Sequence, residues 1–189
     1  MYIGVIAKRY AKALFDYAVE QGVERQVYEE VLQLISVYHA TDELRQVLSD
    51  PLLPKEKKLA VLLEAAKLGT RAVSDVWHKF IALVLLHKRE PLILFIAYSY
   101  VKLYRHVKHI SMVHLTTATK LSTATGERLK RMVEEHSRHS SEVILEEHVD
   151  PDIIGGFIFQ LDDHRLDASA KHEFEMIKNH FIDKNARIV

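Results

Sequence analysis

The stretch "VDPDIIGGFIFQLDDHRLDAS", residues 149 to 169, decides how the C-terminal half of the chain folds. Its central segment, FIFQL at residues 157 to 161, alternates in the manner of a β-strand. The pair Asp162–Asp163 follows where a hairpin needs turn-forming residues, and aspartate supplies that backbone geometry. Asp167 and Ser169 then precede a periodic apolar segment, where side-chain oxygens cap free helix amides. The stretch therefore predicts a strand, a turn and the start of a helix.

The same stretch contains residue types that occur in phosphate and metal sites. A P-loop requires G-x-x-x-x-G-K-[ST] leading into a helix, and a dinucleotide site requires G-x-G-x-x-G between a strand and a helix. Gly155 and Gly156 lie before a predicted strand and match neither pattern, which favours a bend or bulge in that strand. The aspartates at 162, 163 and 167 do not follow the spacing of a calcium loop. We interpret them as turn and cap residues.

The rest of the chain offers no recognisable catalytic constellation. Among the 12 histidines, His106 and His109 are three residues apart, as are His136 and His139, but neither pair resembles H-E-x-x-H. No G-x-S-x-G nucleophile motif occurs. We therefore expect no catalytic, cofactor-binding or metal-ligating residues. The alternative that stays open is a small enzyme or ligand-binding domain that uses the acidic hairpin at residues 162–169.

The composition is that of a globular chain without a dominant charge. The 189 residues contain 26 Lys plus Arg and 26 Asp plus Glu, so no field of one sign directs the protein to nucleic acid. The absence of cysteine excludes disulfides, thiol catalysis and cysteine-ligated metal centres. The most hydrophobic region, residues 80 to 101, is divided by HKREP at 87 to 91 into pieces too short to span a bilayer. We expect a soluble protein without direct membrane insertion, whose association with a membrane would be through a partner.

The N-terminal half, residues 6 to about 106, shows helical periodicity almost throughout. Short connections between the helical segments predict a six-helix bundle over residues 1–107. The first expected helix has a core stripe of Ile6, Tyr10, Ala13, Leu14 and Tyr17, and the second begins after Gly22 with a stripe of Val27, Val31, Leu34 and Tyr38. The third is capped by Thr41 or Asp42 and ends at Asp50–Pro51, and the fourth has Pro54 in its first turn and Gly69 as its stop. The fifth begins at Thr70 or Ser74 and is ended by Glu90–Pro91, and the sixth runs from about 91 to 107.

Residues 108–189 follow a different pattern and predict a small mixed α/β domain. HISMVHLTTATKL (109–121) and SEVILEEHV (141–149) have the alternation of strands, and a helix lies between them. The chain ends in a helix after the hairpin, so the fold class is α+β with two domains. The expected apolar positions are Leu129, Met132, Val133 and His136 on the middle helix, Val143, Leu145 and Val149 on the second strand, and Ala170, Phe174, Ile177 and Phe181 on the last helix.

The N-terminal helices carry more apolar surface than a bundle needs. Ala7, Ala11 and Phe15 form a second stripe beside the expected core stripe of the first helix. FIALVLL, at residues 80 to 86, is apolar nearly all round. A helix in a two-layer bundle buries only one stripe. The extra faces indicate either a central position in the bundle or a groove that accepts a partner helix, and the residues alone leave both open.

Two separated motifs resemble those of one protein family. "AKRYAKALFDYAVEQG", residues 7 to 22, resembles the opening helix of the delta subunit of bacterial F-type ATP synthases, whose mitochondrial counterpart is the oligomycin-sensitivity-conferring protein. "VDPDIIGGFIFQLDDHRLDASAKHEFEMI", residues 149 to 177, resembles the C-terminal signature of that family. The resemblance covers essentially the whole chain. The family commonly has glycine where this chain has Asp162 and Ala168. The residues that carry the signature as a structural motif are Asp150, Gly155, Gly156, Phe157, Asp163, Asp167 and Ser169.

The resemblance implies a non-catalytic clamp in the peripheral stalk, the stator of the synthase. In this family the N-terminal domain binds N-terminal helices of the alpha subunits on the catalytic head, and the C-terminal domain holds the b-subunit stalk. Such a clamp resists rotor torque during proton-driven ATP synthesis, and it lies on the cytoplasmic face of the bacterial plasma membrane through its complex. The residues expected to contact a partner helix are Tyr10, Ala11, Leu14 and Phe15 on the first helix and Trp77, Phe80, Ile81 and Val84 on the fifth.

Overall fold

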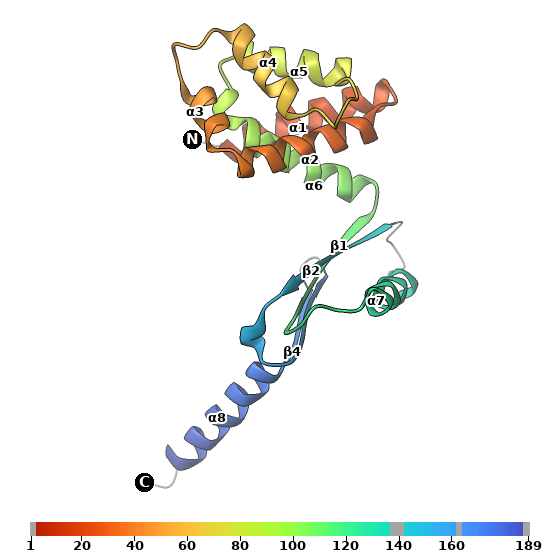
Figure 1. Ribbon diagram of the computed structural model, residues 1–189, viewed down its shortest axis with the longest axis vertical. Helices are drawn as coiled ribbons and strands as arrows, with labels where there is room; N and C mark the ends of the chain where they lie inside the picture. The colour runs from red at the N-terminus through yellow and green to blue at the C-terminus, as the bar shows by residue number, and fades with distance from the viewer. Residues whose placement is uncertain (1–2, 137–141, 162–163, 187–189) are drawn as a thin grey trace. The chain divides into compact units, whose positions relative to one another are not determined.

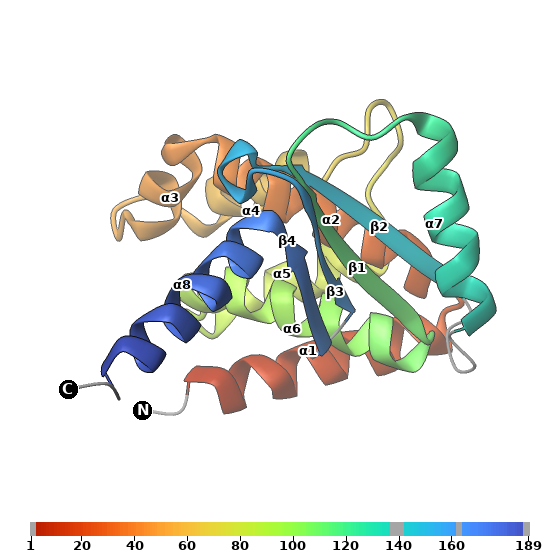
Figure 2. The same ribbon diagram turned by 90° about the horizontal axis from the view of Figure 1, so that it is seen from below.

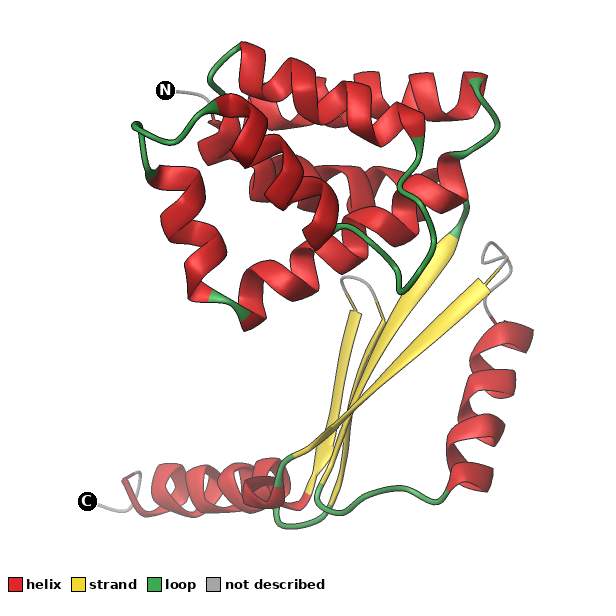
Figure 3. Cartoon of the chain, turned by 45° about the horizontal axis from the view of Figure 1, so that its top comes forward, coloured by secondary structure: helices red, strands yellow, loops and turns green. Residues whose placement is uncertain are grey.

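A computed structural model describes residues 3–136, 142–161 and 164–186 of the chain. The chain divides into two compact units, Met1–Arg105 and His106–Val189. The first is helical, and the second combines a sheet with helices (Figures 1 and 3). Over the described residues there are eight α-helices and a mixed sheet of four strands, so the expected α+β class is confirmed.

The helical unit buries a continuous set of apolar side chains contributed by each of its longer helices. Leu14, Val31, Trp77 and Tyr100 are all almost fully removed from solvent. Figure 2 shows the unit from a second direction. Its elements are α1 (Ile3–Glu20), α2 (Glu24–Ala40), α3 (Asp42–Ser49), α4 (Lys55–Ala65), α5 (Asp75–Leu86), the 3-10 turn η1 (Glu90–Leu92) and α6 (Ile93–Val107).

Two helix boundaries follow the signals expected from the sequence. α1 ends at Glu20, and the turn that closes it contains Gly22, which has a φ of +66°. The amide of Val23 donates to the carbonyl of Ala18 at 2.9 Å. This is the left-handed closing turn that glycine permits at low steric cost. α5 begins after Ser74, whose Oγ accepts a hydrogen bond from the amide of Trp77. Each helix therefore starts or stops where a residue of suitable backbone or side-chain chemistry is available.

The limits of α4 differ from expectation. Pro54 precedes the helix instead of occupying its first turn, because its ψ of 144° is extended and not helical. Its carbonyl accepts hydrogen bonds from the amides of Lys57 and Lys58 in the first turn. The helix ends at Ala65 and not at Gly69. The amide of Lys67 donates to the carbonyl of Glu64 in a tighter turn, and Gly69, with a φ of +59°, lies in the following loop.

The expected core stripe of α1 was wrong for most of its members. Ile6, Tyr10 and Tyr17 are only partly buried, and Ala13 is exposed. The second stripe, which the sequence presents as extra apolar surface, is the buried one. Leu14 is the only expected core residue of α1 that is also buried. Small side chains on this face let α1 approach its neighbours closely, which a stripe rich in tyrosine would prevent. The buried residues of α1 are Ala7, Ala11, Leu14, Phe15 and Ala18.

The second unit is built on a sheet with the strand order β2-β1-β3-β4. β1 and β2 are parallel and are joined through α7, as a parallel pair requires, while β3 pairs antiparallel with β1 and with β4. The elements are β1 (Ile110–Thr117), α7 (Thr123–His136), β2 (Glu142–Val149), the 3-10 turn η2 (Pro151–Ile153), β3 (Gly156–Leu161), β4 (His164–Ser169) and α8 (Ala170–Ala186).

The register places the apolar positions of three strands on one face. Val113 of β1 is paired with Leu145 of β2 and Leu161 of β3, and it packs against Val143. The alternation expected for the first strand is confirmed, since Val113 is buried and His114 is exposed. On β2 the alternation fades at Val149, which is 42% exposed. The side chains of the stripe expected on the middle helix, Leu129, Met132, Val133 and His136, lie outside the described residues.

Candidate partner-binding surfaces

An apolar groove of about 410 Å³ runs between α1 and α5. The ring of Tyr10 meets the ring of Phe80 edge-on across it, with centroids 6.3 Å apart. Tyr10 Oη and His87 Nδ1 lie within hydrogen-bond distance at 3.2 Å, which ties α1 to the residue that follows α5. Such a surface accepts the apolar ridge of a partner helix. The lining residues are Arg9, Tyr10, Ala13, Leu14, Tyr17, Lys79, Phe80 and Leu83.

The residues predicted to contact a partner lie in two environments. Tyr10, Leu14 and Phe80 line the groove, although Leu14 and Phe80 are themselves only 1% and 8% exposed. The others belong to the core of the helical unit, where they shape the walls from behind. Their direct contact with a partner stays a prediction. These core residues are Ala11, Phe15, Trp77, Ile81 and Val84, each less than 9% exposed.

Sequence reasoning missed several lining residues. Ala13 and Tyr17 carried a usable signal, because they share a stripe with Tyr10, but that stripe was interpreted as core. Leu83 lies in the apolar stretch of α5 and is 44% exposed. Arg9 and Lys79 are charged, so no apolar pattern indicates them. A groove is defined by which stripe remains uncovered, and that depends on the packing of all the helices.

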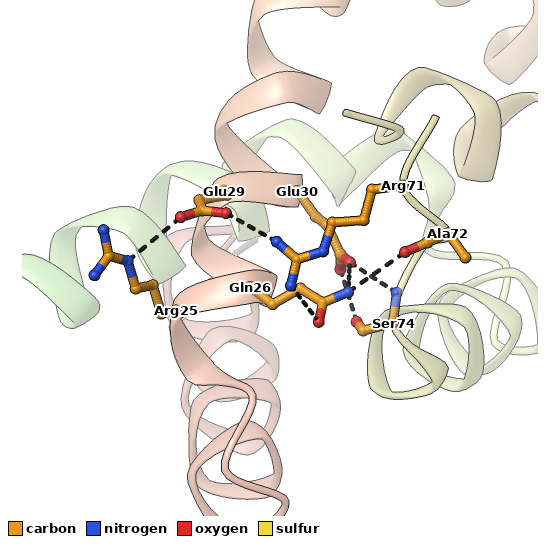
Figure 4. A network of polar contacts seen from close by, with 7 residues as sticks. All are labelled: Arg25, Gln26, Glu29, Glu30, Arg71, Ala72 and Ser74. Atoms are coloured by element: carbon orange, nitrogen blue, oxygen red, sulfur yellow. Dashed lines mark hydrogen bonds and ion pairs between the residues drawn. The ribbon is translucent and has the colours of Figure 1, made fainter. Parts of the chain in front are cut away.

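The N-terminal end of α5 is held by hydrogen bonds to Glu30 of α2 (Figure 4). The amide of Ser74 donates to Glu30 Oε1 at 2.7 Å, and Ser74 Oγ donates to Glu30 Oε2 at 2.7 Å. Gln26 Nε2 adds a third hydrogen bond to Oε1 at 2.9 Å. Glu30 is only 3% exposed, so its carboxylate is satisfied by protein donors. These contacts fix the start of one groove wall against α2.

A charged layer lies beside this buried carboxylate (Figure 4). Arg71 Nη2 donates to Gln26 Oε1 at 3.0 Å, and Arg71 Nη1 reaches Glu29 Oε2 at 3.4 Å. Glu29 also pairs with Arg25 one turn earlier on α2. Exposed ion pairs of this kind contribute little energy individually. Their effect is to hold Gln26 in place and to attach the loop before α5 to α2.

The other wall of the groove is fixed from behind by aromatic packing. The ring centroid of Phe15 on α1 lies 6.1 Å from that of Tyr100 and 6.4 Å from that of Tyr104, both on α6. Tyr104 stacks on Tyr28 of α2 with centroids 4.2 Å apart. Burial raises the pKa of the Tyr100 hydroxyl well above its usual range. Both walls of the groove are therefore supported by the core of the unit.

In the second unit, the glycine pair forms the joint between η2 and β3. Gly156 has a φ of +72°, and a Cβ built on it would lie 2.1 Å from the carbonyl oxygen of Ala168. The carbonyl of Gly155 accepts a hydrogen bond from the amide of Ala170, the first residue of α8. Asp150 Oδ1 caps the η2 turn by accepting from the amide of Asp152 at 3.0 Å. In the structure the pair meets a steric constraint at Gly156 and makes a backbone hydrogen bond at Gly155.

Asp167 and Ser169 form the start of α8. Asp167 Oδ1 accepts from Ser169 Oγ at 2.6 Å and from the Ser169 amide at 3.1 Å. Ser169 Oγ in turn accepts from the amide of His172 at 3.2 Å, which is the expected helix cap. The hydrogen bonds from Ser169 hold the pKa of the Asp167 carboxyl below its usual value, and Arg165 Nη2, 3.2 Å from Asp167 Oδ2, adds to the shift. Asp163 of the predicted motif lies outside the described residues.

In the described part of the second unit, no group of three His, Asp or Glu side chains has the geometry to hold a metal ion. A cavity of about 500 Å³ is lined by residues from 120–127 and 142–147, and it includes no residue of the hairpin at 162–169. Phe157, the remaining residue of the predicted motif, is 41% exposed on β3. At its described positions, the hairpin provides the hydrogen bonds of Asp167 and Ser169 that start α8.

The last helix presents apolar side chains to solvent. Phe174, Met176 and Ile177 of α8 are 60%, 61% and 53% exposed. The stripe expected on this helix is therefore uncovered at Phe174 and Ile177, and the side chain of its last member, Phe181, lies outside the described residues. No helix in the described ranges is both long and apolar enough to cross a bilayer. These side chains form the second candidate surface for a partner.

Comparison with known proteins decides the family. The family model described as ATP synthase delta (OSCP) subunit matches residues 6–181. The chain belongs to the ATP synthase delta (OSCP) family. It is 42% identical to ATP synthase subunit delta of Phocaeicola vulgatus over 189 residues, which cover all of both chains. It is 33% identical to ATP synthase subunit delta of Lactobacillus acidophilus over 182 residues, 95% of this chain and 96% of that one.

The fold agrees with this assignment. A chain of the Toxoplasma gondii mitochondrial ATP synthase hexamer superposes with a TM-score of 0.69 at 17% identity, covering 93% of this chain and 97% of that chain. As a member of the delta (OSCP) family, the chain is a component of the peripheral stalk of an F-type ATP synthase. It is a structural stator subunit and does not itself catalyse a reaction, so the reading of the hairpin as an enzyme site is not favoured.

Proposed function

We propose that the helical unit binds an N-terminal helix of an alpha subunit in the groove between α1 and α5, and that the second unit holds the b-subunit stalk. The clamp so formed resists rotor torque while ATP synthesis proceeds. The observation that carries the proposal is the apolar groove itself, with Ala13 and Leu83 exposed in it. A stator subunit that joins other subunits requires accessible apolar surface of this kind.

The shape of the groove fits a helix better than it fits a small ligand. Its walls are two helices, and its exposed apolar side chains come from turns of α1 and α5. An amphipathic helix places side chains at i, i+3, i+4 and i+7 along one face, which suits a channel between two helices. The lining includes Tyr10 and Tyr17, and tyrosine is a residue type enriched at protein interfaces.

The attachment of the walls supports a mechanical role. Glu30 and Ser74 fix the start of α5, and Phe15 packs α1 against α6. A groove whose walls were free to separate would lose part of its binding energy to ordering when the partner docks. A preformed groove avoids that cost and transmits force without first deforming.

For the b subunit, the supporting observation is the uncovered face of α8. Phe174 and Ile177 are three residues apart, so they share one face of the helix, and both are more than half exposed. Covering them with a partner helix would remove apolar area from water. The subunit would then be peripheral to the membrane complex, on the cytoplasmic side of a bacterial plasma membrane, through its partners.

Titration calorimetry of the full chain with an alpha-subunit N-terminal peptide from the same organism tests the groove. We expect binding that Leu83→Asp weakens at least about tenfold, because a carboxylate would be buried against apolar side chains. The matched control is Leu52→Asp, since Leu52 is a leucine outside the groove and 89% exposed. Absence of binding by the unmodified chain, or equal weakening by both variants, contradicts the proposal.

A further inference from the structure

We propose that the helix docking in the groove carries acidic side chains on both flanks of its apolar stripe, and that Arg9 of α1 and Lys79 of α5 recognise them. This inference rests on the proposed function, because it requires that the groove take a partner helix. It adds the chemistry by which the groove distinguishes one amphipathic helix from another.

Arg9 and Lys79 stand on opposite walls. Both line the groove, and both are exposed. Neither makes an ion pair or a hydrogen bond through its side chain within the described ranges. Long basic side chains pack their aliphatic stems on apolar surface and keep the charge at the edge. The groove therefore has an apolar floor and an unpaired cation on each rim.

Several basic side chains elsewhere in the helical unit are paired with carboxylates, whereas Arg9 and Lys79 make no such pair within the described ranges. Arg25 and Arg71 both contact Glu29, and Lys58 contacts Glu90 at 3.3 Å. The groove lining, in contrast, contains no Asp or Glu. The negative charge that would complement the rims is therefore not supplied by the lining of the groove itself.

Charge complementarity selects the occupant. In paired helices, charged residues beside the apolar seam decide which partner is accepted. A helix with acidic flanks gains attraction at both rims, whereas one with basic flanks meets like charges on both sides. A second copy of this chain docking by the same face would set Arg9 and Lys79 against identical cations, because a two-fold contact uses the same patch twice. The geometry therefore favours an acidic amphipathic helix over self-association.

Two model peptides test this inference on the full chain. Both have about 18 residues and an identical leucine stripe, and their flanking positions carry Glu in one and Lys in the other. We expect the Glu peptide to bind at least about tenfold more tightly, since two rim contacts change from attraction to repulsion. That difference shrinks when the ionic strength rises from about 0.05 to 0.5 M, because the rims are exposed to solvent.

The double variant Arg9→Glu/Lys79→Glu is expected to reverse the preference between the peptides. The control is Lys57→Glu, a charge reversal at an exposed residue of α4 that does not line the groove. Circular dichroism of each variant checks that the fold is retained. If the double reversal does not fold, Arg9→Gln/Lys79→Gln replaces it, and this variant is expected to abolish the preference without adding negative charge.

Equal binding of the two peptides, or a preference that the double variant leaves unchanged, overturns the inference. It would leave the proposed function standing if the alpha-subunit peptide still bound. Sedimentation that shows a dimer, dissociated by Leu83→Asp, would also overturn the inference, because it would identify a second copy as the occupant. Failure of the alpha-subunit peptide alone, with the Glu peptide still preferred, would instead contradict the proposed function.

Discussion

Glu30 of α2 and Ser74 at the start of α5 are joined by two hydrogen bonds of 2.7 Å, one to each carboxylate oxygen. The two residues are 44 positions apart in sequence, and both are buried. Ser74 at the same time caps α5 through the amide of Trp77. One buried carboxylate therefore orients the residue that begins a wall of the groove.

Replacing Glu30 tests this arrangement. Glu30→Ala leaves the Ser74 amide without a partner in a buried site, and we expect a loss of about 3 kcal/mol in the free energy of unfolding of the helical unit. Glu30→Gln retains one acceptor oxygen and is expected to lose less. Urea unfolding followed by the fluorescence of Trp77 measures both. Hydrogen exchange at the first turn of α5 should accelerate in Glu30→Ala, and unchanged exchange there would contradict the orienting role.

The two helices that form the groove, α1 and α5, both end in the same type of closing turn. A different residue type occupies the position with positive φ in each turn. α5 closes with the amide of Arg89 donating to the carbonyl of Val84 at 2.9 Å, as α1 closes with Val23. The position with positive φ is Gly22 in α1, at +66°, and Lys88 in α5, at +54°. A side chain in that region is sterically unfavourable, and glycine is not.

We therefore expect Lys88→Gly to stabilise the helical unit by about 0.5 to 1 kcal/mol. The reciprocal change, Gly22→Ala, should destabilise it by about 1 kcal/mol. A Cβ at Gly22 meets nothing within 4 Å, so the backbone conformation alone is tested. Thermal unfolding monitored by circular dichroism measures both variants. Destabilisation by Lys88→Gly would mean that its side chain has a contact that outweighs the strain.

Adjacent glycines in the second unit are expected to respond differently to the same substitution. Gly156→Ala places a Cβ 2.1 Å from the carbonyl oxygen of Ala168, at a φ of +72°. Gly155→Ala places one 3.8 Å from the Cβ of Ala170, which is ordinary contact. We expect Gly156→Ala to cost at least about 3 kcal/mol of stability and Gly155→Ala less than about 1 kcal/mol. Equal midpoints in urea would show that the joint can shift to admit a side chain.

Signals that act locally predicted much of the fold. Gly22 and Ser74 lie just before the helices that were expected to follow them, because left-handed backbone and side-chain capping depend on a few neighbouring atoms. The strand after Gly156 and the helix after Ser169 followed from alternation and cap chemistry in the same way. The structural role of this stretch was therefore readable from its residues.

The position of the groove was not readable in that way. Tyr10 and Ala13 fit a core stripe of α1 as well as Ala7 and Ala11 do, and only the packing of several helices decides which stripe is covered. The buried role of Glu30 was hidden for a similar reason, since its partner Ser74 lies on a distant segment. Long-range contacts of this kind leave no periodic trace in a sequence.

Asp167 should make the stability of the second unit sensitive to acid. Its pKa in the folded state is lowered from an ordinary value of 3.8, first by the hydrogen bonds from Ser169 and then by Arg165. A carboxyl with a depressed folded-state pKa contributes its stabilisation in full above its unfolded-state pKa and loses it as the pH falls through the folded-state value. The contribution is therefore present at neutral pH and disappears from about pH 4 downward.

In Asp167→Asn, the remaining amide oxygen can still accept from Ser169, but no charge titrates there. Urea midpoints of the second-unit transition between about pH 5 and pH 2 should fall less steeply in this variant than in the unmodified chain. Asp152→Asn, which changes an exposed carboxyl with no resolved hydrogen bond through its side chain, is the control. Parallel pH profiles for the unmodified chain and Asp167→Asn would show that Asp167 acts through hydrogen bonding alone and that its charge stabilises nothing.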